Sequence, residues 1–372
     1  MAQATRAVVT DDSHFMRSVI SDMLGEAGVE VVGEARNGRE AVRAVREHEP
    51  DVVTMDVEMP EMNGIEAVEE IMATAPTPVL MLSAHTDENA DVTFEALEKG
   101  AVDFFTKPGG EVSMEMSRLK DQLVEMVQSV AEVDVSVSPG TGATTPQEAY
   151  TEAVEAAEPA AAGSGGSEAG AVTGPAGSYV DNPTLLLGSS TGGPTVVERI
   201  MAELPLDADL RVLIVQHMPN GFTGRFAERL DARSDYDVQE ATDGARIGGG
   251  EALVAAGGRH MTVTNYARGR LRVSLTEAPP ENSVRPAVDV TMRTAADCIA
   301  DPMVAVILTG MGTDGADGVR AVARAGGHVV AQNEASSAVY GMPKRAVETG
   351  VVDDELALES ITDAVLDALT EA

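Results

Sequence analysis

The chain has 372 residues, and its hydrophobic content of 44% is enough to build two cores of ordinary size. Its 61 acidic residues outnumber its 26 lysines and arginines, and the net charge of −35 argues against nucleic-acid binding through a basic face. The N-terminus carries no hydrophobic signal segment, and no apolar run approaches the roughly 18 residues of a membrane span. We therefore expect a cytoplasmic protein without membrane insertion.

Short apolar runs alternate with helical patterns over residues 1–130. The expected strands are 7–10, 51–55, 78–82 and 101–106, and the expected helices are roughly 14–27, 37–48, 63–74, 87–99 and 112–130. This alternation is typical of a parallel, doubly wound sheet with its functional site at the carboxyl edge.

Polar residues follow the ends of these strands. They are Asp11, Asp12, Asp56, Ser83 and Lys107. Clustered carboxylates bind Mg²⁺, one of them can accept a phosphoryl group, and the cations neutralise the phosphoryl oxygens. Each aspartate alone is also explained as a cap or turn residue, but the combination favours a phosphorylation site.

The composition changes sharply over residues 131–179, which are rich in Ala, Gly, Ser, Thr, Pro and Glu. Such a segment buries too little apolar surface to order itself, so we predict a flexible linker. The predicted division is therefore a first domain at 1–130, this linker, and a second domain at 180–372.

The second domain opens with the apolar run 184–187, followed by the sequence GSSTGGP at 188–194 and a helical pattern over 195–204. This strand, turn and helix place Ser190 at a sheet edge and at the positive end of a helix dipole, as in a nucleophile elbow. A phosphate-cradling loop and an ordinary strand-to-helix turn are the alternatives. A Walker-type loop is disfavoured because no Gly-Lys-Ser/Thr follows.

A nucleophilic serine needs a base, and three histidines lie in this half of the chain. His217 ends the strong strand signal 211–217, at the same edge as Ser190 if the sheet is parallel. His260 lies in a turn and is the second candidate, whereas His328 begins a strand and should lie at the opposite edge. A hydrogen-bonded structural role is the alternative for each of them.

Asp314 is the first carboxylate after the buried run 302–310, at or near the start of the helix that follows. Pure helix capping would also explain it, and we expect capping and the orientation of His217 to need different geometries, so the sequence leaves both roles open. The chain order Ser190, His217, Asp314 argues against the α/β-hydrolase fold, in which the acid precedes the histidine.

Residues 184–353 resemble the catalytic domain of the chemotaxis protein-glutamate methylesterases, also called glutamine deamidases. The matching motifs are 188–193, 216–219, 258–261, 308–316, 332–336 and 340–343. The resemblance implies Ser190 as nucleophile, His217 as base and Asp314 as the orienting acid. It places Thr191 and Met311 beside the site, with backbone N–H groups near the oxyanion. It implies no cofactor for ester hydrolysis and assigns no role to 258–261.

Residues 5–130 resemble a response-regulator receiver domain. This implies Asp56 as phospho-acceptor, Mg²⁺ held by Asp11, Asp12, Asp56 and the Glu58 carbonyl, and a switch formed by Ser83, Phe104 and Lys107. A histidine kinase would supply the phosphoryl group. The fold class is thus α/β, with two doubly wound parallel-sheet domains.

Three functions follow from these patterns. The first is a phosphorylation-activated hydrolase that demethylates glutamyl esters on methyl-accepting chemoreceptors and deamidates receptor glutamines. The second is a phosphorylation-controlled esterase of the same fold acting on another ester. The third is a response regulator without enzymatic activity, which the presence of all three triad residues opposes. The acidic excess with only four lysines resembles proteins of salt-loving organisms.

Overall fold

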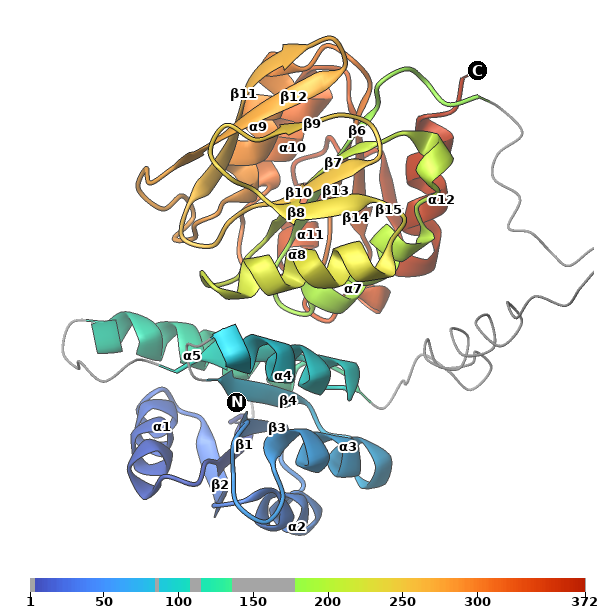
Figure 1. The fold of residues 1–372 in the computed structure, drawn as a ribbon. Coiled ribbons are helices and arrows are strands. Elements are labelled where there is room, and N and C mark those ends of the chain that lie inside the picture. The colour runs from blue at the N-terminus through green and yellow to red at the C-terminus, as the bar shows by residue number, and fades with distance from the viewer. Residues whose placement is uncertain (1–3, 84–86, 108–114, 136–177, 372) are drawn as a thin grey trace, which may run out of the picture.

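The structure is a computed structural model that describes residues 4–83, 87–107, 115–135 and 178–371. It contains two α/β domains, with the N-terminal domain drawn in blue to cyan and the C-terminal domain in green to red (Figure 1). Most of the segment predicted as a linker, 131–179, lies outside the described residues. Among the described residues, no helix is both long enough and apolar enough to cross a bilayer.

The N-terminal domain is a five-stranded parallel sheet of order β2-β1-β3-β4-β5. Its strands are β1 (Arg6–Thr10), β2 (Glu30–Ala35), β3 (Val52–Asp56), β4 (Val79–Ser83) and β5 (Asp103–Thr106). Its helices are α1 (His14–Glu26), α2 (Gly38–His48), α3 (Gly64–Thr74), α4 (Asp87–Glu98) and α5 (Glu115–Ala131). Each expected element is present, with boundaries displaced by up to three residues.

The C-terminal domain is built on a seven-stranded parallel sheet of order β15-β14-β13-β6-β7-β10-β8. Its strands are β6 (Thr184–Ser189), β7 (Arg211–Gln216), β8 (Asp237–Glu240), β10 (Glu251–Val254), β13 (Met303–Ile307), β14 (His328–Gln332) and β15 (Asp354–Leu356). Its α-helices are α7 (Gly193–Glu203), α8 (Phe222–Arg233), α9 (Val288–Cys298), α10 (Ala316–Arg324), α11 (Met342–Val347) and α12 (Leu358–Ala368).

A small antiparallel sheet of order β11-β12-β9 lies beside the main sheet. Its strands are β9 (Arg246–Ile247), β11 (His260–Ala267) and β12 (Arg270–Thr276). The chain then passes through the segment 277–287 before α9 begins. In the main sheet β6 is flanked by β7 and β13, so the turns that follow these three strands meet at one edge.

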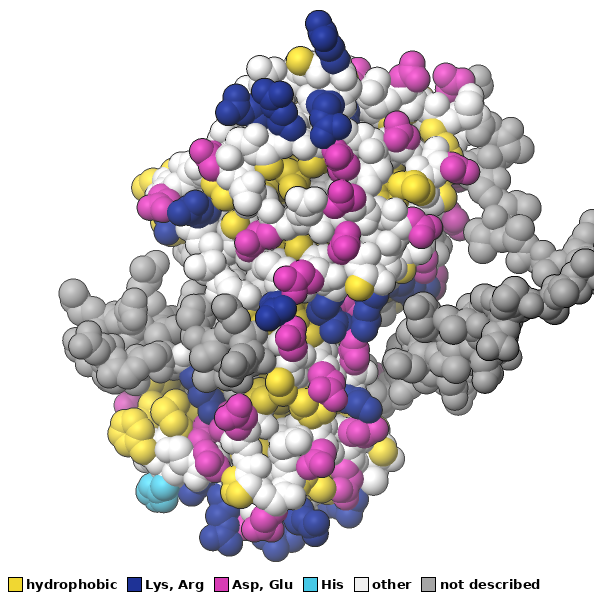
Figure 2. Space-filling model, in the orientation of Figure 1, with side chains coloured by type: hydrophobic (Ala, Val, Ile, Leu, Met, Phe, Trp, Pro, Cys, Tyr) yellow, Lys and Arg dark blue, Asp and Glu magenta, His cyan; other side chains and the backbone are white. Residues whose placement is uncertain are grey.

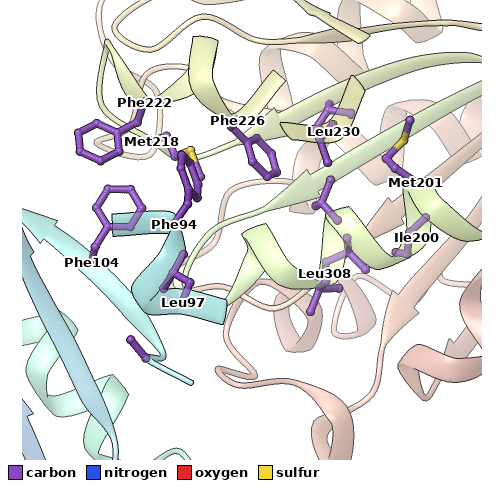
Figure 3. Packing of buried hydrophobic residues seen from close by; sticks show 14 of the residues in the cluster. Phe94, Leu97, Phe104, Ile200, Met201, Met218, Phe222, Phe226, Leu230 and Leu308 are labelled. Carbon is purple, nitrogen blue, oxygen red and sulfur yellow. The ribbon is translucent and has the colours of Figure 1, made fainter. Parts of the chain in front are cut away.

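The two domains meet where α4 faces α8 and α7 (Figure 1), and the start of β5 reaches α8 through Phe104. Figure 3 shows Phe94 and Phe104 of the first domain beside Phe222 and Phe226 of the second. The Phe104 and Phe222 rings stack with centroids 4.6 Å apart, and those of Phe94 and Phe226 stack at 6.0 Å. One hydrophobic cluster therefore runs through both domains.

Ion pairs border this aromatic contact. Glu98 of α4 pairs with Arg229 at 2.7 Å and also with Arg233, and both arginines pair with Glu198 of α7 at 2.8 Å. Elsewhere, acidic side chains are scattered over the visible face of both domains (Figure 2). The interface thus pairs two arginines of the second domain with acidic side chains of both domains.

Candidate active site and phosphorylation site

The turn between β6 and α7 presents Ser190. Gly192 has a φ of 71°, and a Cβ on Gly193 would lie 2.2 Å from the Gln216 Oε1 atom, so both positions require glycine. Ser189 is buried and its hydroxyl donates to Gln216 at 2.5 Å, whereas Ser190 is partly exposed. Of the two serines, only Ser190 is therefore accessible to a substrate.

His217 directly follows β7, and its Nε2 atom lies 2.8 Å from the Asp314 Oδ2 atom. The pairing occupies Nε2, so Nδ1 is the nitrogen that is left for the serine. Among the described contacts, the Ser190 hydroxyl makes no hydrogen bond to His217. Such catalytic hydrogen bonds often form only when substrate binds. The structure thus brings His217 and Asp314 together at the sheet edge that carries Ser190.

Asp314 is 2% exposed and is surrounded by donors. Besides His217, its carboxylate accepts from the N–H groups of Val288 at 2.6 Å and Asp289 at 3.1 Å, and from Asn282 at 3.0 Å. Burial alone would raise the pKa of Asp314, but the hydrogen bond and charge of His217, together with the two N–H groups, hold it below its ordinary value.

Capping and orienting His217 are therefore not exclusive for Asp314, contrary to the expectation from sequence. Asp314 caps α9, whose first N–H groups it accepts, and not α10, whose N-cap is Gly315. The physical reason is that the N-terminus of α9 lies next to the Asp314 carboxylate. The same oxygen, Oδ2, therefore contacts both the imidazole of His217 and the first N–H group of α9.

Thr191 and the segment that leads into Met311 lie beside Ser190. Thr191 follows Ser190 and is buried, and its carbonyl accepts from the Thr309 hydroxyl at 2.9 Å. A Cβ on Gly310 would lie 2.7 Å from the Ser190 Cβ atom, so the segment leading into Met311 packs directly on the serine.

His260 is not beside Ser190 in the hydrogen-bond network. Its Nε2 atom lies 3.1 Å from the Pro279 carbonyl, and its Nδ1 atom accepts from the Ala287 N–H at 3.2 Å. Both ring nitrogens therefore contact backbone, which leaves neither free to act as base. His328 begins β14 and lies 2.8 Å from Asp354, at the opposite edge as expected.

In the first domain, the carboxylates of Asp11, Asp12 and Asp56 offer oxygens within 4.8 Å of one another, a donor set that fits Mg²⁺. Lys107 reaches Asp11 at 2.7 Å and Asp56 at 2.6 Å. Burial raises the pKa of Asp56 to about 6, against the lowering effect of Lys107. Glu58, two residues after Asp56, is exposed.

The expected switch residues connect this site to the domain interface. Ser83 is buried and its hydroxyl accepts from Thr93 of α4 at 3.0 Å. Phe104 stacks on Phe222 of the other domain. The sequence pointed to these residues as a switch but not to their contact with the second domain.

Asp103 is a site residue that the sequence analysis did not find. It begins β5 and is buried, its carboxylate accepts the N–H of Phe104 at 2.7 Å, and it faces the hydroxyl of Thr191 and the N–H of Gly192 in the turn that carries Ser190. Burial raises its pKa to about 7, although these donors and the N–H of Phe104 oppose the rise. The sequence feature that could have identified Asp103 is the presence of an aspartate within an otherwise apolar strand.

Comparisons with known proteins place these two sites in a known context. Residues 185–365 match the family model described as CheB methylesterase, and residues 7–117 match that of the response regulator receiver domain. A protein-glutamate methylesterase/protein-glutamine glutaminase from Haloarcula marismortui is 68% identical over 370 residues, covering 100% of this chain and 99% of that protein.

More distant relatives carry the same description. One from Pyrococcus horikoshii is 40% identical, over 99% of this chain and 95% of that protein. The crystal structure of the Thermotoga maritima CheB methylesterase catalytic domain is 37% identical, with a TM-score of 0.48, over 50% of this chain and 98% of that one.

Proposed function

The chain belongs to the CheB methylesterase family with an N-terminal receiver domain, and we propose that it is a phosphorylation-activated hydrolase of chemoreceptor glutamyl methyl esters. It would also deamidate selected receptor glutamines. The observation that carries the proposal is the 2.8 Å contact of His217 with Asp314 beside the partly exposed Ser190. No observation favours the alternative of another ester.

In the proposed reaction, Ser190 attacks the ester carbonyl while the Nδ1 atom of His217 takes the hydroxyl proton. Asp314 stabilises the imidazolium and keeps its orientation. The N–H groups of Thr191 and Met311 would hold the oxyanion, each worth roughly 3–4 kcal/mol. His217 returns the proton to the departing methanol, and water then hydrolyses the acyl-enzyme. For glutamine, ammonia leaves in place of methanol.

The first domain would control this reaction through Asp56, phosphorylated by the chemotaxis histidine kinase. Asp11, Asp12, Asp56 and the Glu58 carbonyl would hold Mg²⁺, which neutralises phosphoryl charge when bound. Lys107 lies within 2.7 Å of two of these carboxylates and is placed to contact the phosphoryl oxygens. The reaction would take place in the cytoplasm, on the receptors' cytoplasmic side.

The contacts between the domains support a resting state in which the receiver lies against the turn that carries the serine and restricts the approach of a receptor to it. Asp103 faces the Thr191 hydroxyl and the Gly192 N–H, and the Phe104 ring stacks on that of Phe222. A receptor segment that binds at this turn would compete with Asp103 for these donors. Phosphorylation would act through Ser83 and Phe104 to separate the domains.

The decisive experiment measures methanol released from methyl-labelled chemoreceptor membranes by the full chain. A small phosphodonor and Mg²⁺ should raise the rate, and Ser190→Ala should abolish it. Methanol release that is unaffected by Ser190→Ala would refute the proposal.

A further inference from the structure

The segment 277–287 passes beside Asp314, the candidate acid of the triad. We infer that Asn282, an exposed residue of this segment, is a positioning residue of the hydrolytic reaction. The side-chain amide would hold Asp314 in place for His217 and separate it from a second carboxylate, Asp289. The inference rests on the proposed serine hydrolysis, but it concerns residues to which neither the sequence motifs nor the comparisons assign a role.

Asn282 bridges two carboxylates with a single amide nitrogen. Its Nδ2 atom donates to Asp289 at 2.8 Å and to Asp314 at 3.0 Å. The Thr313 hydroxyl lies 3.5 Å from the Asn282 oxygen, which directs the nitrogen toward the acids. An NH₂ group has two hydrogens, so one asparagine can satisfy one oxygen of each acid.

The two acids are brought together by an exchange of helix caps. Asp314, just before α10, accepts the first N–H groups of α9. In return Asp289, in the first turn of α9, accepts the N–H groups of Gly315 at 3.0 Å and Gly318 at 2.6 Å at the start of α10. Each helix dipole thus favours the charge on the other helix's acid.

This exchange stabilises both helix ends but places two negative charges close together. Burial, and then the charge of Asp314, raise the pKa of Asp289 to about 6. Asp317 adds a further negative charge near Asp289, while Arg293 is the facing cation and the imidazole of His217 is the titratable group that faces Asp314. Asn282 is the neutral donor between the acids, so it reduces their repulsion without adding a charge.

His260 holds the segment that delivers Asn282. One ring nitrogen contacts the carbonyl of Pro279, three residues before Asn282, and the other accepts the N–H of Ala287, five residues after it. Glu281 is also tied to Arg293 of α9 at 2.7 Å. The motif at 258–261 therefore gains a role as the anchor of this segment, and His260 acts through Asn282.

The predicted signature is a shift in the pH profile. Without the Asn282 donor, the negative charge of Asp314 is less well neutralised, and this favours the imidazolium form of His217. The acid limb of the kcat/KM profile should therefore move to higher pH. Asp289→Asn removes a negative charge from the same pair and should move that limb to lower pH. A role that is only structural would not produce opposite shifts.

The test uses the full chain with Asn282→Gly, because glycine tolerates the φ of +52° at this position. Asn182→Gly is the matched control, since Asn182 is also exposed with a φ of +52°. Asn282→Gly should lower kcat by about 10- to 100-fold with little change in KM or melting temperature. The control should leave all three unchanged.

Hydrolysis of p-nitrophenyl acetate supplies a readout that is independent of the receptor substrate. If Ser190→Ala removes this activity but receptors yield no methanol, the substrate assignment fails and the Asn282 test can still be read. Asn282→Asp, which places a third carboxylate at the exposed position, should move the acid limb further to higher pH. An unchanged kcat and acid limb in Asn282→Gly would overturn the inference, as would a loss explained by unfolding alone.

Discussion

The buried carboxylate of Asp103 in the receiver domain faces the hydroxyl of Thr191, the residue that follows the candidate nucleophile Ser190. A receiver side chain thus occupies donors beside the reacting serine. Burial, opposed by these donors, raises the pKa of Asp103 to about 7 from an ordinary value of 3.8. The ionised form therefore opposes the contact, and the protonated form favours it.

Autoinhibition should accordingly depend on pH through Asp103. An acid whose pKa is raised in the closed state stabilises that state fully below about pH 4, and the stabilisation is lost as pH rises through about 7. Asp103→Asn stays neutral, so it should lower the unphosphorylated activity at pH 8. The ratio of wild-type to Asp103→Asn activity should rise between about pH 5 and 7, measured as methanol release.

Because both proteins share His217, this ratio removes the titration of the catalytic groups. Asp91→Asn is the matched control, since Asp91 is an exposed interface aspartate 3.9 Å from Arg225. Its ratio to wild type should stay flat with pH. A flat ratio for Asp103→Asn as well would show that Asp103 does not regulate closure.

The ion pairs of Glu98 should stabilise the closed state. Glu98→Gln weakens its contacts with Arg229 and Arg233, so unphosphorylated activity should rise several-fold while phosphorylated activity stays the same. Glu95→Gln, one turn earlier on α4 and exposed, is the control and should have little effect. Equal effects of the two changes would rule out a specific role for the Glu98 cluster.

The triad predicts a graded loss of activity. Ser190→Ala should abolish methanol release, His217→Ala should be nearly as severe, and Asp314→Asn should be damaging but milder. Ser189→Ala is the control for the neighbouring serine, whose hydroxyl donates to Gln216 and not to the triad. If His260→Ala were inactive and His217→Ala active, the base would be His260 instead.

Phosphorylation should require Asp56 and Mg²⁺. Asp56→Asn should not incorporate phosphate from a small donor and should hold the enzyme at its basal rate, and chelation of Mg²⁺ should stop incorporation into wild type. Asp51→Asn, at the opposite end of the same strand region, tests for a nonspecific charge effect. Normal incorporation into Asp56→Asn would place the acceptor elsewhere.

Salt should stabilise the protein because its net charge is −35. Raising KCl from dilute buffer toward about 1 M shortens the Debye length to roughly 3 Å and screens carboxylate repulsion. The melting temperature should therefore rise, with much of the early gain at modest salt. A flat or falling melting temperature would show that the acidic excess is no adaptation to salt, without bearing on Ser190 or His217.

The sequence by itself indicated four of the five strands and all five helices of the first domain, missing β2, and it placed Ser190, His217, Asp314 and Asp56 at the ends of strands. These depend on local signals, namely apolar runs that end in polar turns, and short motifs at those ends. In parallel sheets, strand polarity then places such residues at one edge, even before the pairing of the strands is known.

Only the tertiary structure decided which helix Asp314 caps, what His260 does, and that Asp103 contacts Thr191. The sequence placed Asp314 with the helix that follows it, whereas α9 supplies the N–H groups. Asp103 and Thr191 are far apart in the chain and meet only when the domains pack. Hydrogen bonds and burial between distant segments depend on how the formed helices and strands pack against one another. Local sequence patterns do not encode this packing.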